Sequence, residues 1–177
     1  QREFYQLVLS QTPFYAESGG QVGDTGWLID SQGNKTRIFD VKKENNLIVH
    51  LCESLPVSLG ETLSAQIEVN RRINIQKNHS ATHLLHHALR TVLGTHVEQK
   101  GSLVSPDYLR FDFSHFAKVT DEEMEQVVSL MEQQISANIL LNEKRNTPIS
   151  EAQAMGAMAL FGEKYGELVR VIQFGES

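Results

Sequence analysis

The hydrophobic pattern of the chain changes near residue 70, and this change restricts the folds that it can adopt. Before residue 70, short apolar stretches are separated by turn residues, and apolar residues alternate with polar ones from Leu63 to Val69. A period of two is typical of half-buried strands. From Ala81 to Leu93 the apolar residues recur at helical spacing, and Gly94 is a natural C-terminal stop. The sequence therefore predicts an α+β protein with two parts, residues 1–70 and 71–177.

The first part is expected to consist of strands alone. Short strands with a turn about every ten residues are typical of a small barrel or sandwich. The expected strands are Phe4–Leu9, Gly26–Ile29, Thr36–Val41, Leu47–Cys52 and Leu63–Val69.

The second part is expected to place helices on an antiparallel sheet. After the first helix, Thr120 and Glu123 have the spacing of a capping box and predict the start of a second helix. A short helix is expected at Ile149–Ala154. The expected strands of this part are Val97–Val104, Leu109–Phe113 and Leu168–Phe174.

Charge and cysteine content narrow the class of protein. The net charge is −6, whereas a dedicated nucleic-acid binder is usually basic, so contact with nucleic acid would need a local patch. Arg71, Arg72, Lys77 and Arg90 surround the expected first helix and could form one, although scattered charges are more often only solvated. The single Cys52 excludes a disulfide framework within the chain and fits a reducing, cytoplasmic location. No apolar run approaches the length of a membrane span.

Two histidines with metal-ligand spacing lie on the expected first helix. His79 and His83 are four residues apart, so both imidazoles lie on one helix face and could reach one Zn²⁺ ion. Ser80 follows the first histidine, so the metalloprotease pattern with its glutamate base is absent. Two ligands do not complete a tetrahedral site, and a helix that is merely rich in histidine remains the alternative.

A glycine-rich loop separates the first two expected strands. Gly19 and Gly20 would let the backbone approach a ligand closely, and the polar Gln21, Asp24 and Thr25 could then contact a hydroxyl or an amide. The alternative is a tight turn without any ligand, which the composition alone favours.

A third polar cluster lies on two neighbouring expected strands. Lys100 and Arg110 could contact phosphate, and Gln99 could face a pocket. Ordinary strand residues with alternating faces would give the same pattern, and Arg110 could simply pair with Asp112.

Taken together, these segments resemble the editing domain of alanyl-tRNA synthetases. Each motif is weak alone, but five of them in the order and spacing of that family are highly specific. The matching segments are Phe14–Gly26, Asn78–Leu85, Gly94–Ser102, Arg110–His115 and Gly156–Tyr165.

The resemblance implies a glycine-rich β-barrel followed by an α/β editing core. It also implies that His79 and His83 are zinc ligands, and that a Cys and a His of a later segment complete the site. Because the chain ends at Ser177, we expect it to stop before that segment and to hold zinc poorly.

The resemblance assigns roles to the remaining polar residues. Gln99 and Lys100 are expected at the catalytic site, where Gln99 would contact the aminoacyl group. The residues expected to contact the substrate or the tRNA are Gly19, Gly20, Gln21, Asp24, Thr25 and Arg110.

The implied activity is hydrolysis of tRNA(Ala) that wrongly carries serine or glycine, within an enzyme that attaches alanine to tRNA(Ala) using ATP. The expected partners are the acceptor end of that tRNA and the other domains of the enzyme. Three alternatives stay open: a freestanding trans-editing deacylase, the related domain of threonyl-tRNA synthetase, and a tRNA-docking module without activity. The Phe14–Gly26 loop and the Ala157–Gly162 stretch favour the alanyl family over the threonyl one.

Overall fold

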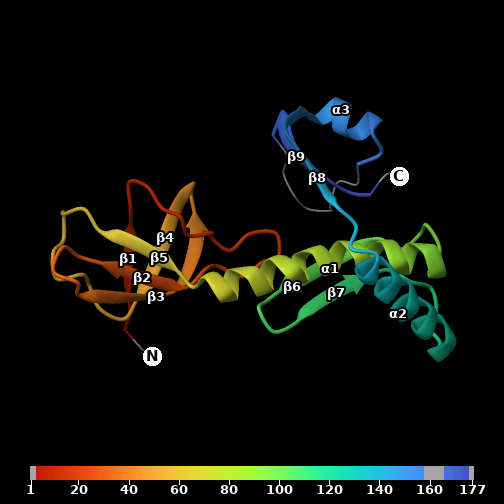
Figure 1. Cartoon of the computed structure of the whole chain (residues 1–177), viewed down its shortest axis with the longest axis horizontal. Helices are drawn as coiled ribbons and strands as arrows, with labels where there is room; N and C mark the ends of the chain where they lie inside the picture. The colour runs from red at the N-terminus through yellow and green to blue at the C-terminus, as the bar shows by residue number, and fades with distance from the viewer. Residues whose placement is uncertain (1–2, 158–165, 176–177) are drawn as a thin grey trace. The chain divides into compact units, whose positions relative to one another are not determined.

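The computed structural model describes residues 3–157 and 166–175 (Figure 1). The chain divides into two compact units: unit 1 is Gln1–Thr82 with Gly101–Phe111, and unit 2 is His83–Lys100 with Asp112–Ser177. Part of the last matching segment, residues 158–165, lies outside the described residues.

The described residues contain nine strands and three helices, joined by loops. The strands of unit 1 before the first helix are β1 (Tyr5–Val8), β2 (Gly26–Ile29), β3 (Lys35–Glu44), β4 (Leu47–Cys52) and β5 (Ser64–Ile67). The later strands are β6 (Gln99–Val104), β7 (Leu109–Phe113), β8 (Leu141–Pro148) and β9 (Leu168–Phe174). The helices are α1 (Val69–Leu93), α2 (Asp121–Ser136) and α3 (Ile149–Ala154).

Strands β1 to β5 form one antiparallel sheet in the order β1-β4-β3-β2-β5 (Figure 1). Strand β2 is paired on both edges: Gly26 is opposite Ile38 of β3 and Ile67 of β5. All five strands were expected from the sequence. The closed barrel is not shown: among the described strands, β1 pairs with β4 and β5 pairs with β2, and no pairing joins β1 to β5.

One face of this sheet carries the hydrophobic core of unit 1. Alternate residues of a strand point to the same face, so Ile38 of β3 and Leu28 of β2 can pack together with Phe14 from the loop before β2. Cys52 is buried in the same cluster, and burial raises the pKa of its thiol. This thiol is therefore a small apolar core group.

Helix α1 is longer than the sequence predicts. The expected helix began near Ala81, whereas α1 begins at Val69 and adds a first half in which only Ile75 is fully buried. Polar contacts to the loop before β2 and to the loop after β6 compensate for the few apolar residues there; Asn78 Nδ2, for example, donates to the Ser105 carbonyl oxygen at 2.8 Å. In the part of the chain that the structure describes, no helix is both long and apolar enough to cross a membrane.

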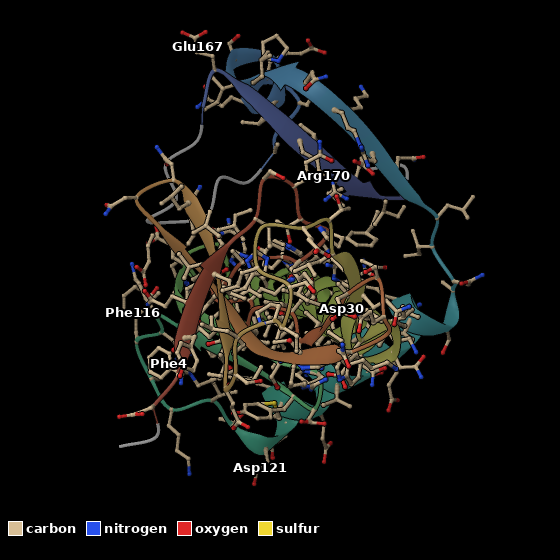
Figure 2. All side chains as sticks on the ribbon, turned by 90° about the vertical axis from the view of Figure 1, so that its left-hand side faces the viewer. Phe4, Asp30, Phe116, Asp121, Glu167 and Arg170 are labelled. Carbon is tan, nitrogen blue, oxygen red and sulfur yellow. The ribbon has the colours of Figure 1, made fainter. Side chains whose placement is uncertain are left out.

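Unit 2 contains α2, α3 and the paired strands β8 and β9. The expected capping box is confirmed: Thr120 Oγ1 accepts from the Glu123 amide at 3.2 Å, and the Glu123 carboxylate accepts from the Thr120 amide at 2.8 Å. Strands β8 and β9 are antiparallel, and Arg170 lies on β9 (Figure 2). Its Nε pairs with the Glu143 carboxylate of β8 at 2.8 Å. The sequence did not predict β8.

A buried histidine in β4 links three segments of unit 1. His50 is fully buried, and its Nδ1 lies 3.1 Å from the Leu7 carbonyl oxygen, which can only accept, so Nδ1 donates. Thr12 Oγ1 lies 2.7 Å from Nε2 and donates to it, while it accepts from the Phe14 amide at 3.1 Å. These bonds are all consistent with a neutral ring.

Because of the buried His50 ring, the free energy of unfolding is expected to decrease when the pH is lowered. Burial lowers the pKa of His50 below its usual value, although the bond to the Leu7 carbonyl opposes the shift. Unfolded chains therefore bind a proton more readily than folded ones. Stability should be lost as the pH falls below about 6.5, until the pH passes the lowered pKa of the folded state. Burial shifts the pKa of His86 in the same direction.

Urea unfolding followed by the fluorescence of Trp27, the single tryptophan, measures this effect in unit 1. We expect the free energy of unfolding to be smaller at about pH 5.5 than at about pH 7.5, and the His50→Gln variant to show a weaker pH dependence. Equal pH dependence in the two proteins would contradict the role of His50.

Candidate functional site

The glycine-rich loop between β1 and β2 is a tight turn built on two glycines. Gly19 and Gly20 have φ values of 58° and 80°, which side-chain-bearing residues adopt at a cost. The turn is closed by the Gln21 amide, which donates to the Ser18 carbonyl oxygen at 2.9 Å. A Cβ atom on Gly20 would lie 2.5 Å from the Ser102 carbonyl oxygen, so the loop backbone packs directly against β6.

Strand β6 forms backbone hydrogen bonds with both neighbours of Gln21 in the loop. The Val104 amide donates to the Gly20 carbonyl oxygen at 2.8 Å, and the Val22 amide donates to the Val104 carbonyl oxygen at 3.1 Å. Gln21 lies between these bonds and is 6% exposed. The side chain of Gln21 is therefore buried on a fixed backbone.

This side chain contacts the first histidine of the expected metal pair. Gln21 Oε1 lies 2.7 Å from Nδ1 of His79, and His79 is half-buried on α1. The structure thus brings together two residues that the sequence analysis treated as parts of separate motifs. His83 follows one helical turn later on the same helix.

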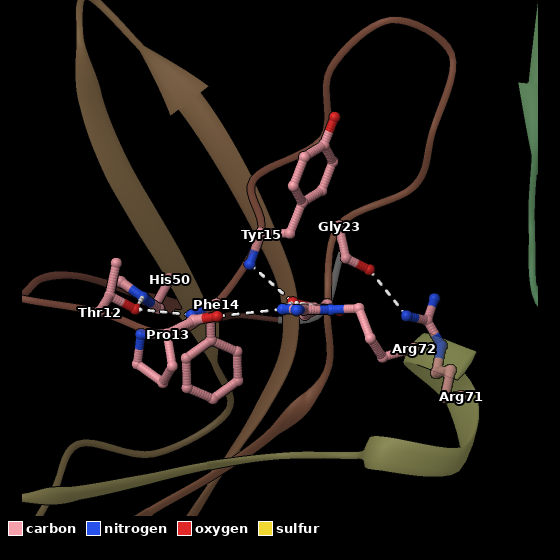
Figure 3. A network of polar contacts seen from close by, with 9 residues as sticks. Thr12, Pro13, Phe14, Tyr15, Gly23, His50, Arg71 and Arg72 are labelled. Carbon is pink, nitrogen blue, oxygen red and sulfur yellow. Dashed lines mark hydrogen bonds and ion pairs between the residues drawn. The ribbon is translucent and has the colours of Figure 1, made fainter. Parts of the chain in front are cut away.

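Asp24 connects the loop to the start of α1. Its side chain is 3% exposed and forms an ion pair with Arg72, in which Nε donates to Oδ1 at 2.8 Å (Figure 3). The Tyr15 amide donates to Oδ2 at 2.6 Å. The bond to Asp24 raises the pKa of Arg72 above its usual value. Arg72 also donates to the Pro13 carbonyl oxygen at 3.0 Å.

Two further contacts complete this connection. Arg71 donates to the Gly23 carbonyl oxygen at 2.8 Å (Figure 3). Thr25 Oγ1 donates to the Glu68 carboxylate, which also accepts from Arg37 at 2.9 Å. The Arg37 bond, followed by that of Thr25, lowers the pKa of Glu68. The sequence analysis did not identify these connections, although an acidic loop and an Arg-Arg pair at a helix start were signals for them.

Three of the expected site residues lie on the strands β6 and β7. Gln99 and Lys100 are the first residues of β6 and belong to unit 2, where Lys100 pairs with Glu98 at 2.9 Å on the surface. That pairing lowers the pKa of Glu98. Arg110 lies in β7, is exposed, and belongs to unit 1.

The chemistry of the donors in α1 fits part of a zinc site. Within residues 3–157 and 166–175, no group of three His, Cys, Asp or Glu side chains is placed to hold a metal ion. His79 and His83 are two imidazole side chains at the spacing that one ion requires, and Nδ1 of His79 lies 2.7 Å from Gln21 Oε1. These residues therefore fit as two ligands of a larger set.

Comparison with known proteins identifies the family of the chain. Residues 1–72 match the sequence profile of the class II (A) tRNA synthetases. The alanine--tRNA ligases of Parabacteroides distasonis and Porphyromonas gingivalis are 64% and 60% identical to it, over 98% and 99% of this chain and 20% of their own length. That of Flavobacterium psychrophilum is 58% identical over 98% of the chain. The chain therefore belongs to the alanine--tRNA ligase family, and it spans about a fifth of the length of the relatives that it matches.

Proposed function

We propose that the chain is the editing part of an alanine--tRNA ligase and hydrolyses the ester of tRNA(Ala) that wrongly carries serine or glycine. The larger enzyme would attach alanine to tRNA(Ala) using ATP in the cytoplasm, with its other domains as partners. We also propose that residues 1–70 and 71–177 are the glycine-rich subdomain and the editing core. The observation that carries the proposal is the contact between Gln21 of the glycine-rich loop and His79 of the histidine pair.

The need for such a second site follows from the energetics of selection. A pocket that accepts alanine cannot exclude the smaller glycine sterically, and it rejects the additional hydroxyl of serine only weakly. Such discrimination is worth about 1–3 kcal/mol, which is too little for accurate translation. A separate hydrolytic site can remove the errors after the ester has formed.

The chain's own residues would bind and orient the ester in this proposal. Gly20 packs directly against β6. At the start of β6, Gln99 would contact the aminoacyl group and Lys100 would pair with a tRNA phosphate. Arg110 is an exposed cation that could pair with tRNA phosphate. Asp24 and Thr25 would hold the loop through Arg72 and Glu68.

His79 and His83 would supply two of the ligands of a Zn²⁺ ion. When bound, this ion would act as a Lewis acid and orient the amino acid or the attacking water. The other ligands, a Cys and a His, are those that the family resemblance implies. With two ligands alone, the affinity for zinc would be low.

A deacylation assay tests the proposal. The assay uses a longer protein in which this chain continues through the Cys-His segment of the family. The substrates are tRNA(Ala) molecules charged with serine, glycine or alanine. We expect the serine and glycine esters to be hydrolysed and the alanine ester to be spared. His79→Ala should lower the rate about a hundredfold or more, because it removes a metal ligand.

His87→Ala is the matched control, because His87 is an exposed residue of the same helix. It should leave the rate unchanged. Equal losses in the two variants would contradict the role of His79. Binding of tRNA without hydrolysis of any ester would instead support the alternative of a docking module.

A further inference from the structure

We propose that Gln21 is a positioning residue that fixes the tautomer of His79. Its carboxamide oxygen accepts a hydrogen bond from Nδ1–H and thereby places the imidazole lone pair on Nε2. This inference deepens the proposed function, because it rests on His79 being a metal ligand there. It assigns the Gln21 side chain to the histidine, whereas the family resemblance assigns it to the substrate.

The donor and acceptor chemistry of the contact supports this assignment. Oε1 of Gln21 lies 2.7 Å from Nδ1 of His79. An amide oxygen has no proton and can only accept, so Nδ1 must carry the proton. A neutral imidazole carries one proton, and the lone pair then belongs to Nε2.

Gln21 is well suited to hold the ring because its own backbone is fixed. The bonds from Val104 to Gly20 and from Val22 to Val104 hold both neighbours of Gln21 at 2.8 and 3.1 Å. Its side chain is buried, so solvent does not compete strongly for the carboxamide. Ordering the Gln21 side chain therefore costs little additional entropy when the bond to His79 forms.

The consequence for metal binding depends on which nitrogen has the lone pair. Zinc binds a neutral imidazole through that lone pair, and a hydrogen bond on the other nitrogen orients the ring. Loss of such a partner typically costs about 10–100-fold in metal affinity. Rotation of the Gln21 amide by 180° would present NH₂ to Nδ1, move the proton to Nε2 and prevent ligation there.

The direct test measures the tautomer of His79 in the metal-free 177-residue chain. Long-range ¹H–¹⁵N NMR spectra distinguish the two ring nitrogens, and a His79→Gln variant assigns the resonances by their loss. At a pH above the imidazole range of about 6.5, we expect the Nδ1–H tautomer in the wild-type chain. Finding the Nε2–H tautomer there would overturn the proposal, whatever the deacylation assay gives.

Three variants separate positioning from a purely structural role. Gln21→Leu removes the acceptor and should release His79 into a mixture of tautomers. Gln21→Glu keeps an acceptor oxygen and should retain Nδ1–H. Gln32→Leu, the same change at an exposed position of unit 1, should have no effect. If Gln21→Leu does not fold, the tautomers of the wild-type chain and of Gln21→Glu still decide the question.

Titration with Zn²⁺ alone, followed on the same ring resonances, provides a second measurement that tolerates weak affinity. We expect Gln21→Leu to bind at least about tenfold more weakly than Gln32→Leu. Equal affinities would show that Gln21 does not position a ligand. If the 177-residue chain shows the Nδ1–H tautomer of His79 but the longer protein hydrolyses none of the esters, the proposed function is overturned. The positioning of His79 by Gln21 then still holds.

Discussion

Replacing Gly26 with valine is expected to unfold the five-stranded sheet of unit 1. A Cβ atom at this position would lie 2.0 Å from the Gln66 carbonyl oxygen and 2.9 Å from both the Ile67 Cα and Phe14 Cε1. Strand β2 has a neighbour on each side at Gly26, so it cannot move away without breaking one of two ladders. We expect a loss of at least about 3 kcal/mol in the free energy of unfolding, which is a large part of a typical domain's stability.

Urea unfolding followed by Trp27 fluorescence measures this loss, because Trp27 is the next residue in β2. Gly166→Ala is the control, since the nearest atom to a Cβ there is the Leu168 carbonyl oxygen at 3.8 Å. The control should change the unfolding midpoint only slightly. A Gly26→Val protein with an unchanged midpoint would show that the sheet tolerates a side chain between β2 and β5.

Replacing Asp24 with alanine is expected to destabilise the glycine-rich loop by about 3 kcal/mol. The substitution leaves the Arg72 guanidinium without its carboxylate and the Tyr15 amide without its acceptor. Removing one partner of a buried ion pair is costly because the other charge remains in a site of low dielectric constant. Asp24→Asn should cost less, because the amide oxygen can still accept from Tyr15.

Glu17→Ala is the matched control on the same loop. Glu17 pairs with Lys42, but both side chains are at least 40% exposed, so the pair contributes about 0–1 kcal/mol. Urea unfolding of the three variants should give the order Asp24→Ala, Asp24→Asn and Glu17→Ala from the largest loss to the smallest. Similar losses for Asp24→Ala and Glu17→Ala would contradict the structural role of the buried pair.

The strands of unit 1 could be predicted because their local pattern decides them. Gly26–Ile29 and Leu47–Cys52 have the predicted bounds, since each is a short β-branched or apolar run between turn residues. What the pattern does not contain is the pairing at the sheet edges. The barrel was expected from strand number and spacing, whereas sheet closure depends on partners for β1 and β5 that a local pattern cannot specify.

The first half of α1 and strand β8 could not be predicted for a related reason. Val69–Asn78 has few apolar residues, and its polar residues contact other segments, as with Arg72 and Asp24 or Asn78 and Ser105. Strand β8 contains the polar run Asn142–Thr147, whose strand conformation depends on pairing with β9. Tertiary contacts override local preference in both segments.

The candidate site shows the same limit. The spacing of His79 and His83 predicts that they share one helix face, and Gly19 and Gly20 predict a tight turn. The structure contains both the helix and the turn. The bond between Gln21 and His79 joins segments far apart in the sequence, so no local spacing could indicate it. Their roles in editing stay predictions that the proposed assays test.

The pairing of Gly20 with Val104 has a consequence for the order of folding. The two residues are 84 positions apart, nearly half of the 177-residue chain, so the glycine-rich loop cannot reach its final conformation during synthesis until β6 has left the ribosome. Strands β1 to β5 can pair earlier, because each of their partners is already present. Closing so long a segment slows the last step, since non-local contacts cost chain entropy before they add stability. The loop is therefore expected to be the last part of unit 1 to become protected from hydrogen exchange during refolding.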